Sequence, residues 1–449
     1  MLLSWNVKDY VPDLRFSDAS AIDQVTLRML LSHTAGLPTA YQPFGRRDPE
    51  ALEAWVREEL PLLPFVASPG KVHAYSNPGI NLAGYIAQVV SGKAYTELMS
   101  EEVFGPLAMQ YTTFDPLVAM TYPIAQAHQC PDGKTLRVWH RFADNSAHRP
   151  SGYALSTVLD LANFAIMQMH DGSFQGKQIL TPNSVRMMQE PQADLYMTTG
   201  AHYGLTLQSE TYKDLRLVGH DGDVNSFLCR FVMVPEAKIA VIMLVNWPAW
   251  LHRLSNAILD ELLSLPKTVS EPEETIPEQR DQAGLTGWYL GQFGLAKILL
   301  KENRLTLELN GEVIPLKAYR THGYVGFDEH EQSVAVGFVP PEQGPTHYLM
   351  VNGSCYTRVA EESLSPADPS AWPTYTGVYT AVFETWVVRV HEGELLLKGE
   401  TFGDEMPCRP LDRTRFTSPV GIIEFREVKE GKASILVQRN AYVFTRMKN

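Results

Sequence analysis

Two short segments combine residue types that can move a proton or hold a polarised acyl group. Tyr75-Ser76-Asn77 precedes an apolar stretch, and His220-Asp221-Gly222, flanked by Gly219 and Asp223, precedes two β-branched stretches. A tyrosine is a useful general acid/base near neutral pH only if cations lower its pKa from about 10. A histidine at a glycine-rich strand edge can bind a carboxylate or ester oxygen. Taken singly, each segment is also typical of a surface turn.

The elements that must position these segments can be predicted from periodicity. Apolar residues at helical spacing predict helices over residues 51–60, about 79–90 and 251–263. Thr157 with Asp160 resembles a capping box, and Thr181-Pro182 is typical of an N-cap followed by a first-turn proline. Two apolar runs, 227–234 and 239–246, predict a buried antiparallel hairpin. The first 266 residues therefore predict an α/β domain of the α+β type.

The C-terminal part changes character. Residues 267–282 are acidic and rich in proline, which indicates a linker. Beyond it, Gly287-Trp288-Tyr289, Phe293 and Leu305-Thr306-Leu307 recur 90 positions later as Gly377-Val378-Tyr379, Phe383 and Leu395-Leu396-Leu397. We expect two β repeats, about 283–362 and 370–449, to close together into one barrel, because closure removes exposed strand edges. Residues 363–369 are the expected joint, and Trp288, Trp372 and Trp386 are expected to fill the barrel or its rim.

Six motifs occur in a fixed order over about residues 1–263: Leu30-Leu31-Ser32-His33-Thr34-Ala35-Gly36-Leu37-Pro38, Tyr75-Ser76-Asn77-Pro78-Gly79, Val103-Phe104-Gly105-Pro106-Leu107-Ala108-Met109, Ser151-Gly152-Tyr153-Ala154-Leu155-Ser156-Thr157, Tyr203-Gly204-Leu205 and His220-Asp221-Gly222. In that order they resemble the β-lactamase-related serine hydrolases, the group of class C β-lactamases, D-Ala-D-Ala carboxypeptidases and family VIII esterases. The resemblance implies an antiparallel central sheet flanked by helices. The C-terminal repeats resemble, more weakly, the lipocalin-like barrel domains appended to some peptidases of this group.

The resemblance also implies residue roles. Tyr75 matches the tyrosine of the Tyr-x-Asn motif, the general acid/base of acylation and deacylation, and Asn77 matches its asparagine. His220 stands in the Lys-Thr-Gly or His-x-Gly element, where histidine resembles the esterase and D-aminopeptidase-like branches. Gly222 and Asp223 match the substrate-binding strand, with the Asp223 N–H as one oxyanion donor. His33 is expected to be a structural hydrogen-bonding group.

The nucleophile is missing from this arrangement. The family carries it in a Ser-x-x-Lys motif upstream of the stretch matched by residues 3–10, so the resemblance implies an N-terminally truncated domain that lacks two sheet strands. Ser68-Pro69-Gly70-Lys71 and Ser264-Leu265-Pro266-Lys267 contain the same spacing. Proline within either string disrupts the helical turn that the motif requires, so we expect neither to be the nucleophile.

Composition limits the partners. The net charge of −13, without a dense Lys/Arg cluster, argues against nucleic acid, and no apolar run is long enough for a membrane span. No histidine or cysteine spacing predicts a metal, and the implied chemistry needs no cofactor. The expected partner is a small-molecule ester, amide or peptide substrate. A homo-oligomer or an upstream complementary segment is left open, as is the compartment, which would be cytoplasmic if the chain is complete, since no signal peptide is visible.

Three functions remain open at this point. The first is covalent acyl transfer on an ester, amide or D-amino-acid peptide. The second is a non-catalytic relative that binds a peptide-like or acyl ligand, and the third is a protein whose barrel is the binding or assembly part. The open edge of strands 227–246 also predicts that the chain alone is poorly stable or prone to aggregation.

Overall fold

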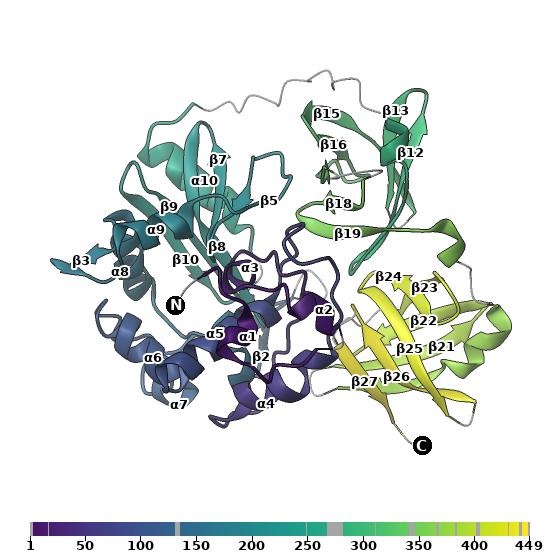
Figure 1. Cartoon of the computed structure of the whole chain (residues 1–449), viewed down its shortest axis with the longest axis horizontal. Coiled ribbons are helices and arrows are strands. Elements are labelled where there is room, and N and C mark those ends of the chain that lie inside the picture. The colour runs from purple at the N-terminus through teal and green to yellow at the C-terminus, as the bar shows by residue number, and fades with distance from the viewer. Residues whose placement is uncertain are drawn as a thin grey trace.

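The computed structural model describes residues 3–16, 18–130, 135–247, 249–266, 282–309, 311–340, 346–364, 368–381, 384–400, 405–429, 431–439 and 442–447 of the 449. Figure 1 shows an α/β domain, drawn in purple to teal, beside two β bodies drawn in green and yellow. The predicted linker lies outside the described residues except for Gln282, and Phe383 and residues 365–367 of the expected joint also lie outside them.

A six-stranded antiparallel sheet forms the centre of the α/β domain, in the order β10-β9-β8-β7-β6-β5. Its strands are β5 (Ala193–Asp194), β6 (His202–Tyr203), β7 (Gln208–Tyr212), β8 (Leu215–Val224), β9 (Phe227–Val234) and β10 (Ile239–Val245). The predicted apolar hairpin is confirmed as β9 and β10. Two short ribbons lie outside this sheet: β1 (Ala127–Gln129) with β2 (Arg137–Trp139), and β3 (Ser173–Phe174) with β4 (Lys177–Gln178).

Helices surround this sheet and begin where the sequence provides caps. They are α1 (Val7–Tyr10), α2 (Ala19–Ile22), α3 (Leu27–Leu31), α4 (Ala51–Glu58), α5 (Asn77–Ser91), α6 (Tyr95–Met99), α7 (Pro116–Ala119), α8 (Val158–Met169), α9 (Pro182–Gln189) and α10 (Leu251–Leu262). Ser76 caps α5. Thr181 caps α9 ahead of Pro182, as predicted. Thr157 caps α8 through the Asp160 N–H, but the Asp160 carboxylate accepts from Tyr111 and Thr112 instead of completing a capping box.

The two faces of the sheet are buried by different helices. Phe231 and Met233 of β9 pack with Ala165 and Met169 of α8, whereas Val232, one position out of phase, packs near Leu259 of α10. This alternation follows from the two-residue period of a strand. The predicted fold class, an antiparallel central sheet flanked by helices and followed by β-barrel structure, is confirmed.

The first β repeat forms its own nine-stranded antiparallel sheet, in the order β14-β13-β12-β11-β19-β18-β17-β16-β15. Its strands are β11 (Gly287–Gly291), β12 (Gly294–Lys301), β13 (Arg304–Leu309), β14 (Glu312–Pro315), β15 (Lys317–Arg320), β16 (Gly323–Phe327), β17 (Ser333–Phe338), β18 (Tyr348–Val351) and β19 (Ser354–Val359). The two edge strands, β14 and β15, are joined through Leu316 alone, so the sheet must curl until its edges nearly meet. At this seam a Cβ on Gly326 would lie 2.3 Å from Ile314, so only glycine fits.

The second β repeat closes completely into an eight-stranded barrel. Its strands are β20 (Gly377–Thr380), β21 (Thr385–His391), β22 (Glu394–Gly399), β23 (Glu405–Pro410), β24 (Arg415–Ser418), β25 (Gly421–Lys429), β26 (Lys432–Gln438) and β27 (Tyr442–Arg446). The prediction that both repeats share one barrel is therefore wrong. Pairing of the first strand with the last within each repeat (β11 with β19, β20 with β27) removes the edges without help from the other repeat.

The repeat itself is evident in the hydrogen bonding of each body. Tyr289 and Tyr379 are fully buried, and their hydroxyls donate to the carbonyls of Leu285 and Tyr375, which are again 90 positions apart. A last-strand arginine lies beside each tyrosine ring. Arg358 donates to Thr286, Gly284, Thr346 and Tyr289, and Arg446 donates to Thr376 and Ala433.

Barrel interiors are filled by side chains. Trp386, Phe416, Phe425 and Phe444 are fully buried in the second barrel, and Trp372 packs in the same cluster. Trp288 is half-buried under the Lys297 ammonium, whose nitrogen lies 4.1 Å from the ring centroid. The expectation that the tryptophans fill the barrel or its rim is met by Trp386 and Trp372. Trp288 instead faces away from the interior, because its neighbour Tyr289 in β11 points inward.

The two arginines give a test of the repeat architecture. We expect Arg358→Met to lower the free energy of unfolding by about 3 kcal/mol, and Arg446→Met by about half as much, because Arg358 makes more hydrogen bonds to carbonyls. Urea denaturation of both variants measures this difference. Equal losses of unfolding free energy in the two variants would contradict the larger stabilising role given to Arg358.

Candidate functional site

The start of α5 is pinned to the turn that follows α3. His33 is 1% exposed, with φ +54°, and its carbonyl accepts from the Ala74 N–H at 2.7 Å. Its ring Nδ1 accepts from the Ser76 N–H at 3.1 Å. These two bonds bracket Tyr75 and fix where its side chain leaves the backbone. The Ser76 hydroxyl accepts from the Gly79 N–H at 3.0 Å, so this serine caps the helix.

Tyr203 of β6 connects this turn to β8. Its hydroxyl lies 3.0 Å from His33 Nε2 and 2.8 Å from His220 Nε2, and His220 Nδ1 faces the Asp221 carbonyl oxygen. Because His33 Nδ1 accepts from Ser76, its Nε2 carries the proton and donates to Tyr203. Tyr203 then donates to His220 Nε2, and His220 Nδ1 donates to Asp221. We call this directional chain of hydrogen bonds, Ser76–His33–Tyr203–His220–Asp221, the relay.

Burial keeps both histidines of the relay neutral. It lowers the pKa of His33 well below the ordinary histidine value, and the nearby His73 and His220 add to the effect. Burial also lowers the pKa of His220, although the Asp221 carbonyl and charge oppose it. Burial, together with Tyr75, raises the pKa of Tyr203 well above the usual value. All three rings are therefore in the protonation state that the relay requires at neutral pH.

Tyr75 lies against the relay without joining it. Its ring centroid is 4.3 Å from that of His33 and 6.2 Å from that of His220. None of the hydrogen bonds found among the described residues involves its hydroxyl, and burial raises its pKa. Tyr75 is therefore a protonated phenol, and none of the residues that the structure describes supplies a cation that would let it act as a base near neutral pH.

The end of β8 provides a strand edge beside the relay. β7 begins at Gln208, opposite Gly219, so residues 220–224 pair with β9 alone. Val224 and Phe227 enclose a two-residue turn and form a hydrogen-bonded pair, so the next pair, Asp223 and Leu228, directs its N–H groups outward. Gly222 and Asp223 are exposed as residues, but partial loss of hydration at the Asp223 carboxyl raises its pKa. This geometry suits an outward backbone donor at Asp223.

Asp221 points to the opposite side of β8 from His220. Its carboxylate lies 3.0 Å from Arg230 and 2.7 Å from His252. Burial acts to raise the pKa of Asp221, but the hydrogen bond from His252 and the charge of Arg230 outweigh it and lower the value. The adjacent letters His220-Asp221 therefore do not form a His–Asp catalytic pair.

A cavity of about 420 Å³ opens beside these residues. Its polar end is formed by His33, Tyr75, Asn77, Tyr203 and His220, and its remaining wall by Leu27, Leu31, Ile80, Ala83, Gly84, Ala87, Tyr95, Pro150, Ser151 and Thr206. The sequence-predicted residues Tyr75, Asn77 and His220 thus share one cavity. Asn77 donates through Nδ2 to the Ala40 carbonyl at 2.9 Å.

Both Ser-x-x-Lys strings lie in non-helical segments. Ser68 and Lys71 are exposed in a turn around Gly70, where the Lys71 N–H donates to the Ser68 carbonyl. Ser264, with φ +51°, follows the end of α10, and Lys267 lies outside the described residues. Neither Ser68 nor Ser264 lines the cavity beside Tyr75.

The bridging role of Tyr203 is not predicted from the sequence, where this residue belongs only to the Tyr-Gly-Leu motif. His73 lies beside the relay, with its ring 5.3 Å from that of Tyr203, and carries no sequence signal of its own. His33, predicted as a structural hydrogen-bonding group, is confirmed in that role. The contact between Tyr203 and His33 could not be predicted from the sequence, because the two residues are 170 positions apart.

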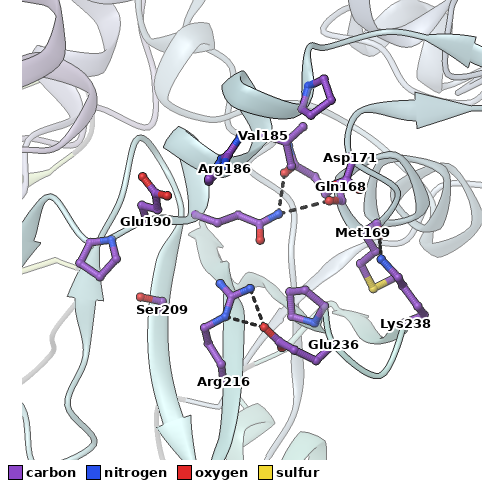
Figure 2. Close-up of a pocket in the computed structure, with 14 residues that line it drawn as sticks. Gln168, Met169, Asp171, Val185, Arg186, Glu190, Ser209, Arg216, Glu236 and Lys238 are labelled. Carbon is purple, nitrogen blue, oxygen red and sulfur yellow. Dashed lines mark hydrogen bonds and ion pairs between the residues drawn. The ribbon is translucent and has the colours of Figure 1, made fainter.

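Figure 2 shows a different cavity, of about 640 Å³, at the far end of the sheet. Arg216 of β8 pairs with Glu236 there, and Gln189 of α9 donates to the carbonyl and amide oxygens of Gln168. Two pairs of its polar side chains are thus bonded to each other. Within the part of the chain that the structure describes, no three His, Cys, Asp or Glu side chains are arranged to hold a metal ion. No helix in the same residues is long and apolar enough to cross a membrane.

Removing the central hydroxyl tests the relay. We expect Tyr203→Phe to lower the free energy of unfolding by about 2 kcal/mol, because two buried imidazole nitrogens lose their partner. Tyr75→Phe is the matched control and should change stability by less than about 0.5 kcal/mol, since no hydrogen bond is lost among the described residues. Urea denaturation measures both; equal effects would argue against the relay.

Acid should destabilise the protein through its buried histidines. Burial lowers the pKa of His73 to about 4, whereas an unfolded histidine titrates near 6.5. Between these values the unfolded chain binds a proton that the folded one does not, so stability falls as pH falls from about 6.5 to about 4. His73→Phe should reduce that slope by about 1.4 kcal/mol per pH unit, with no change of slope above pH 7. Denaturation midpoints measured across this pH range give the slope. An unchanged slope in His73→Phe would refute the role of His73 in the acid sensitivity.

Several curated proteins are similar to part of this chain. A penicillin-binding protein 4 from Amycolatopsis lactamdurans is 25% identical over 301 residues, covering 64% of this chain and 77% of that protein. Several other curated relatives are matched over only 43–47% of their own length.

Solved structures show the same fold. The crystal structure of SurE matches with a TM-score of 0.61 at 21% identity, covering 80% of this chain and 82% of that one. An octameric penicillin-binding protein homologue from Pyrococcus abyssi matches with a TM-score of 0.50 at 20% identity, covering 80% and 83%. The family model described as beta-lactamase matches residues 2–263, which is more than half of the sequence. The chain therefore belongs to the beta-lactamase family.

Proposed function

We propose that this protein is a serine hydrolase acting by covalent acyl transfer on an ester, amide or D-amino-acid peptide. Tyr75 is its general acid/base, and the serine and lysine of the nucleophile come from a segment outside these 449 residues. The observation that carries the proposal is the cavity beside Tyr75. Its polar end holds Tyr75, Asn77 and His220, and its remaining wall is suited to packing against another helix.

The wall of that cavity has the character of a helix-packing surface. Ile80, Ala83, Gly84 and Ala87 of α5 line it and lie on one face of the helix, because they are spaced three and four residues apart. Small side chains stand at three of these four positions, but Pro150 already packs on Gly84, where a Cβ would lie 2.3 Å from the proline ring. The space open to another helix therefore lies beside Ile80, Ala83 and Ala87. A helix seated there would carry its polar residues to the Tyr75 end.

The chemistry needs one cation beside Tyr75. A lysine amine from the added segment would lower the pKa of the Tyr75 phenol, which burial alone raises. The serine Oγ adds to the acyl carbon while its proton passes to the Tyr75–lysine pair, and the bond to the leaving group breaks as that proton is returned to it. Water then repeats the sequence and releases the acid.

His220 and the end of β8 would bind the substrate. The His220 ring is kept neutral by burial and lines the cavity. The outward N–H of Asp223 is placed to face an oxyanion, and Gly222 leaves the strand edge open. A neutral histidine where related proteins carry lysine favours an ester or peptide substrate over a β-lactam.

The sheet edge supports the same added segment. Among the described strands, β10 pairs only with β9. Large apolar side chains stay exposed on the helices beside it: Val158, Leu159 and Ile166 on α8 and Leu254 on α10, together with Trp250 at the start of α10. Exposed apolar side chains of this size are unusual at the edge of a complete domain. Further strands paired with β10 would cover them.

A second candidate is a non-catalytic relative that binds an acyl or peptide-like ligand. It is favoured by the raised pKa of Tyr75, which makes the phenol a hydrogen-bond donor rather than a base. The third possibility, a barrel that binds an apolar ligand, is disfavoured by the filled interior of the second barrel.

Labelling with a fluorophosphonate distinguishes the candidates. The 449-residue chain is compared with a chain extended by the in-frame codons that precede Met1. We expect label only on the extended chain, on a serine of the extension. Tyr75→Phe in the extended chain should slow labelling by about 10² to 10⁴.

Three other outcomes would change the assignment. Label on the 449-residue chain that disappears in Ser68→Ala would place the nucleophile at Ser68 and refute the proposal. An unlabelled extended chain that is still thermally stabilised by a D-amino-acid dipeptide would favour the binding function. Equal labelling rates for the extended chain and its Tyr75→Phe variant would remove Tyr75 from the chemistry.

A further inference from the structure

Residues 39–42 form a loop, here called the Thr39–Gln42 loop, whose backbone is held by side chains from all parts of the molecule. Thr39 bonds to Gln292 of the first β body, and the Tyr41 N–H donates to the Tyr442 hydroxyl of the second barrel at 2.6 Å. The carbonyl of Gln42 accepts from Tyr153 at 2.6 Å and from Asn145 at 3.1 Å. The carbonyl of Ala40, between these anchors, accepts from Asn77.

Gln292 is the anchor with the most connections. Its Oε1 accepts from the Thr39 N–H at 2.9 Å, and its Nε2 donates to the Thr39 carbonyl at 3.2 Å and to the Arg439 carbonyl at 2.5 Å. Its own carbonyl accepts from the Ile422 N–H of the second barrel at 3.1 Å. The side chain is 8% exposed. One buried amide therefore joins the first β body, the second barrel and the α/β domain.

The Thr39–Gln42 loop carries this constraint into the candidate site. Ala40 is 3% exposed and packs in the apolar cluster of the second barrel, so its carbonyl cannot turn freely. That carbonyl holds Asn77 Nδ2 at 2.9 Å, and Asn77 lines the cavity beside Tyr75. With one N–H taken by Ala40, the rotation of the amide is set, and its Oδ1 and second N–H are what it can offer to a bound molecule.

We propose that Gln292 is a positioning residue that lets both β bodies set the orientation of the Asn77 amide. Sites of this kind need their groups held within about 0.5 Å, which requires support from groups that are themselves fixed. The part of the inference that concerns ligand binding rests on the proposed function. The part that concerns the Asn77 amide does not.

The first test follows the Asn77 amide directly. Protein labelled with ¹⁵N-asparagine gives side-chain amide signals, and the Asn77 pair is identified by its loss in Asn77→Ala. We expect Gln292→Ala to shift and broaden that pair, because the carbonyl that holds it gains freedom. Tyr442→Phe, which removes one anchor of the Thr39–Gln42 loop, should cause a smaller shift in the same signals.

Gln189→Ala is the matched control. Gln189 is also 8% exposed and also donates to two oxygens, both on Gln168, and it lines the cavity of Figure 2 at the far end of the sheet. It should lower the thermal unfolding midpoint about as much as Gln292→Ala while leaving the Asn77 signals unchanged. An unchanged Asn77 pair in Gln292→Ala, or equal shifts in both variants, would overturn the inference.

The second test asks whether the effect on binding passes through Asn77. The affinity for a D-alanyl-D-alanine dipeptide, measured by thermal stabilisation of the full chain, should fall about tenfold in Gln292→Ala and show no further loss when Asn77→Ala is already present. Equal losses in both backgrounds would mean that Gln292 acts elsewhere and would overturn the inference. If the dipeptide does not bind the unchanged protein, the proposed peptide substrate is not held by these 449 residues alone, and the amide signals alone decide the role of Gln292.

Discussion

The site depends on a hydrogen-bond chain that works in only one direction. The Ser76 N–H occupies one nitrogen of His33, so the other must donate to Tyr203, and Tyr203 must in turn donate to His220. Protonation of His220 would place two N–H donors against the Tyr203 hydroxyl. Protonation of His33 would place its Nδ1–H against the Ser76 N–H. Burial prevents this by disfavouring the charged rings.

Several elements of the fold serve to keep this chain in place. The α5 N-terminus supplies the first donor, β6 supplies Tyr203, and the end of β8 that overhangs β7 supplies His220. Gly219 lets β9 approach, since a Cβ there would lie 1.9 Å from the Phe231 carbonyl oxygen. The first β body secures the loop before Tyr203, because Arg320 pairs with Asp194 through two hydrogen bonds of 3.0 and 2.9 Å. The first β body thus helps to hold the segment that leads to Tyr203.

Local signals in the sequence predicted the elements well. Thr181 and Pro182 begin α9 through a bond within three residues, and β9 and β10 are adjacent in the chain, so their pattern is sufficient. The position of Tyr75, Asn77 and His220 in one cavity followed from the ordered motifs. Tyr203 as the bridging hydroxyl did not, because its partners are contributed by the α3 turn and β8, which are brought together only by the tertiary fold.

The barrel prediction failed for a similar reason. Two repeats that close together and two that close separately both remove strand edges, and the spacing of 90 residues is the same in either case. What decides is the pairing of β11 with β19 and of β20 with β27, which joins strands about 70 residues apart. The arginines that stabilise these closures, Arg358 and Arg446, are 88 positions apart, so the repeat period of 90 did not align them.

The most direct test of the relay is the ¹⁵N chemical shift of the histidine ring nitrogens at neutral pH. Our account predicts that His33 and His220 are both neutral but opposite tautomers, with the proton on Nε2 of His33 and on Nδ1 of His220. An imidazolium at either position, or the same tautomer at both, would contradict it.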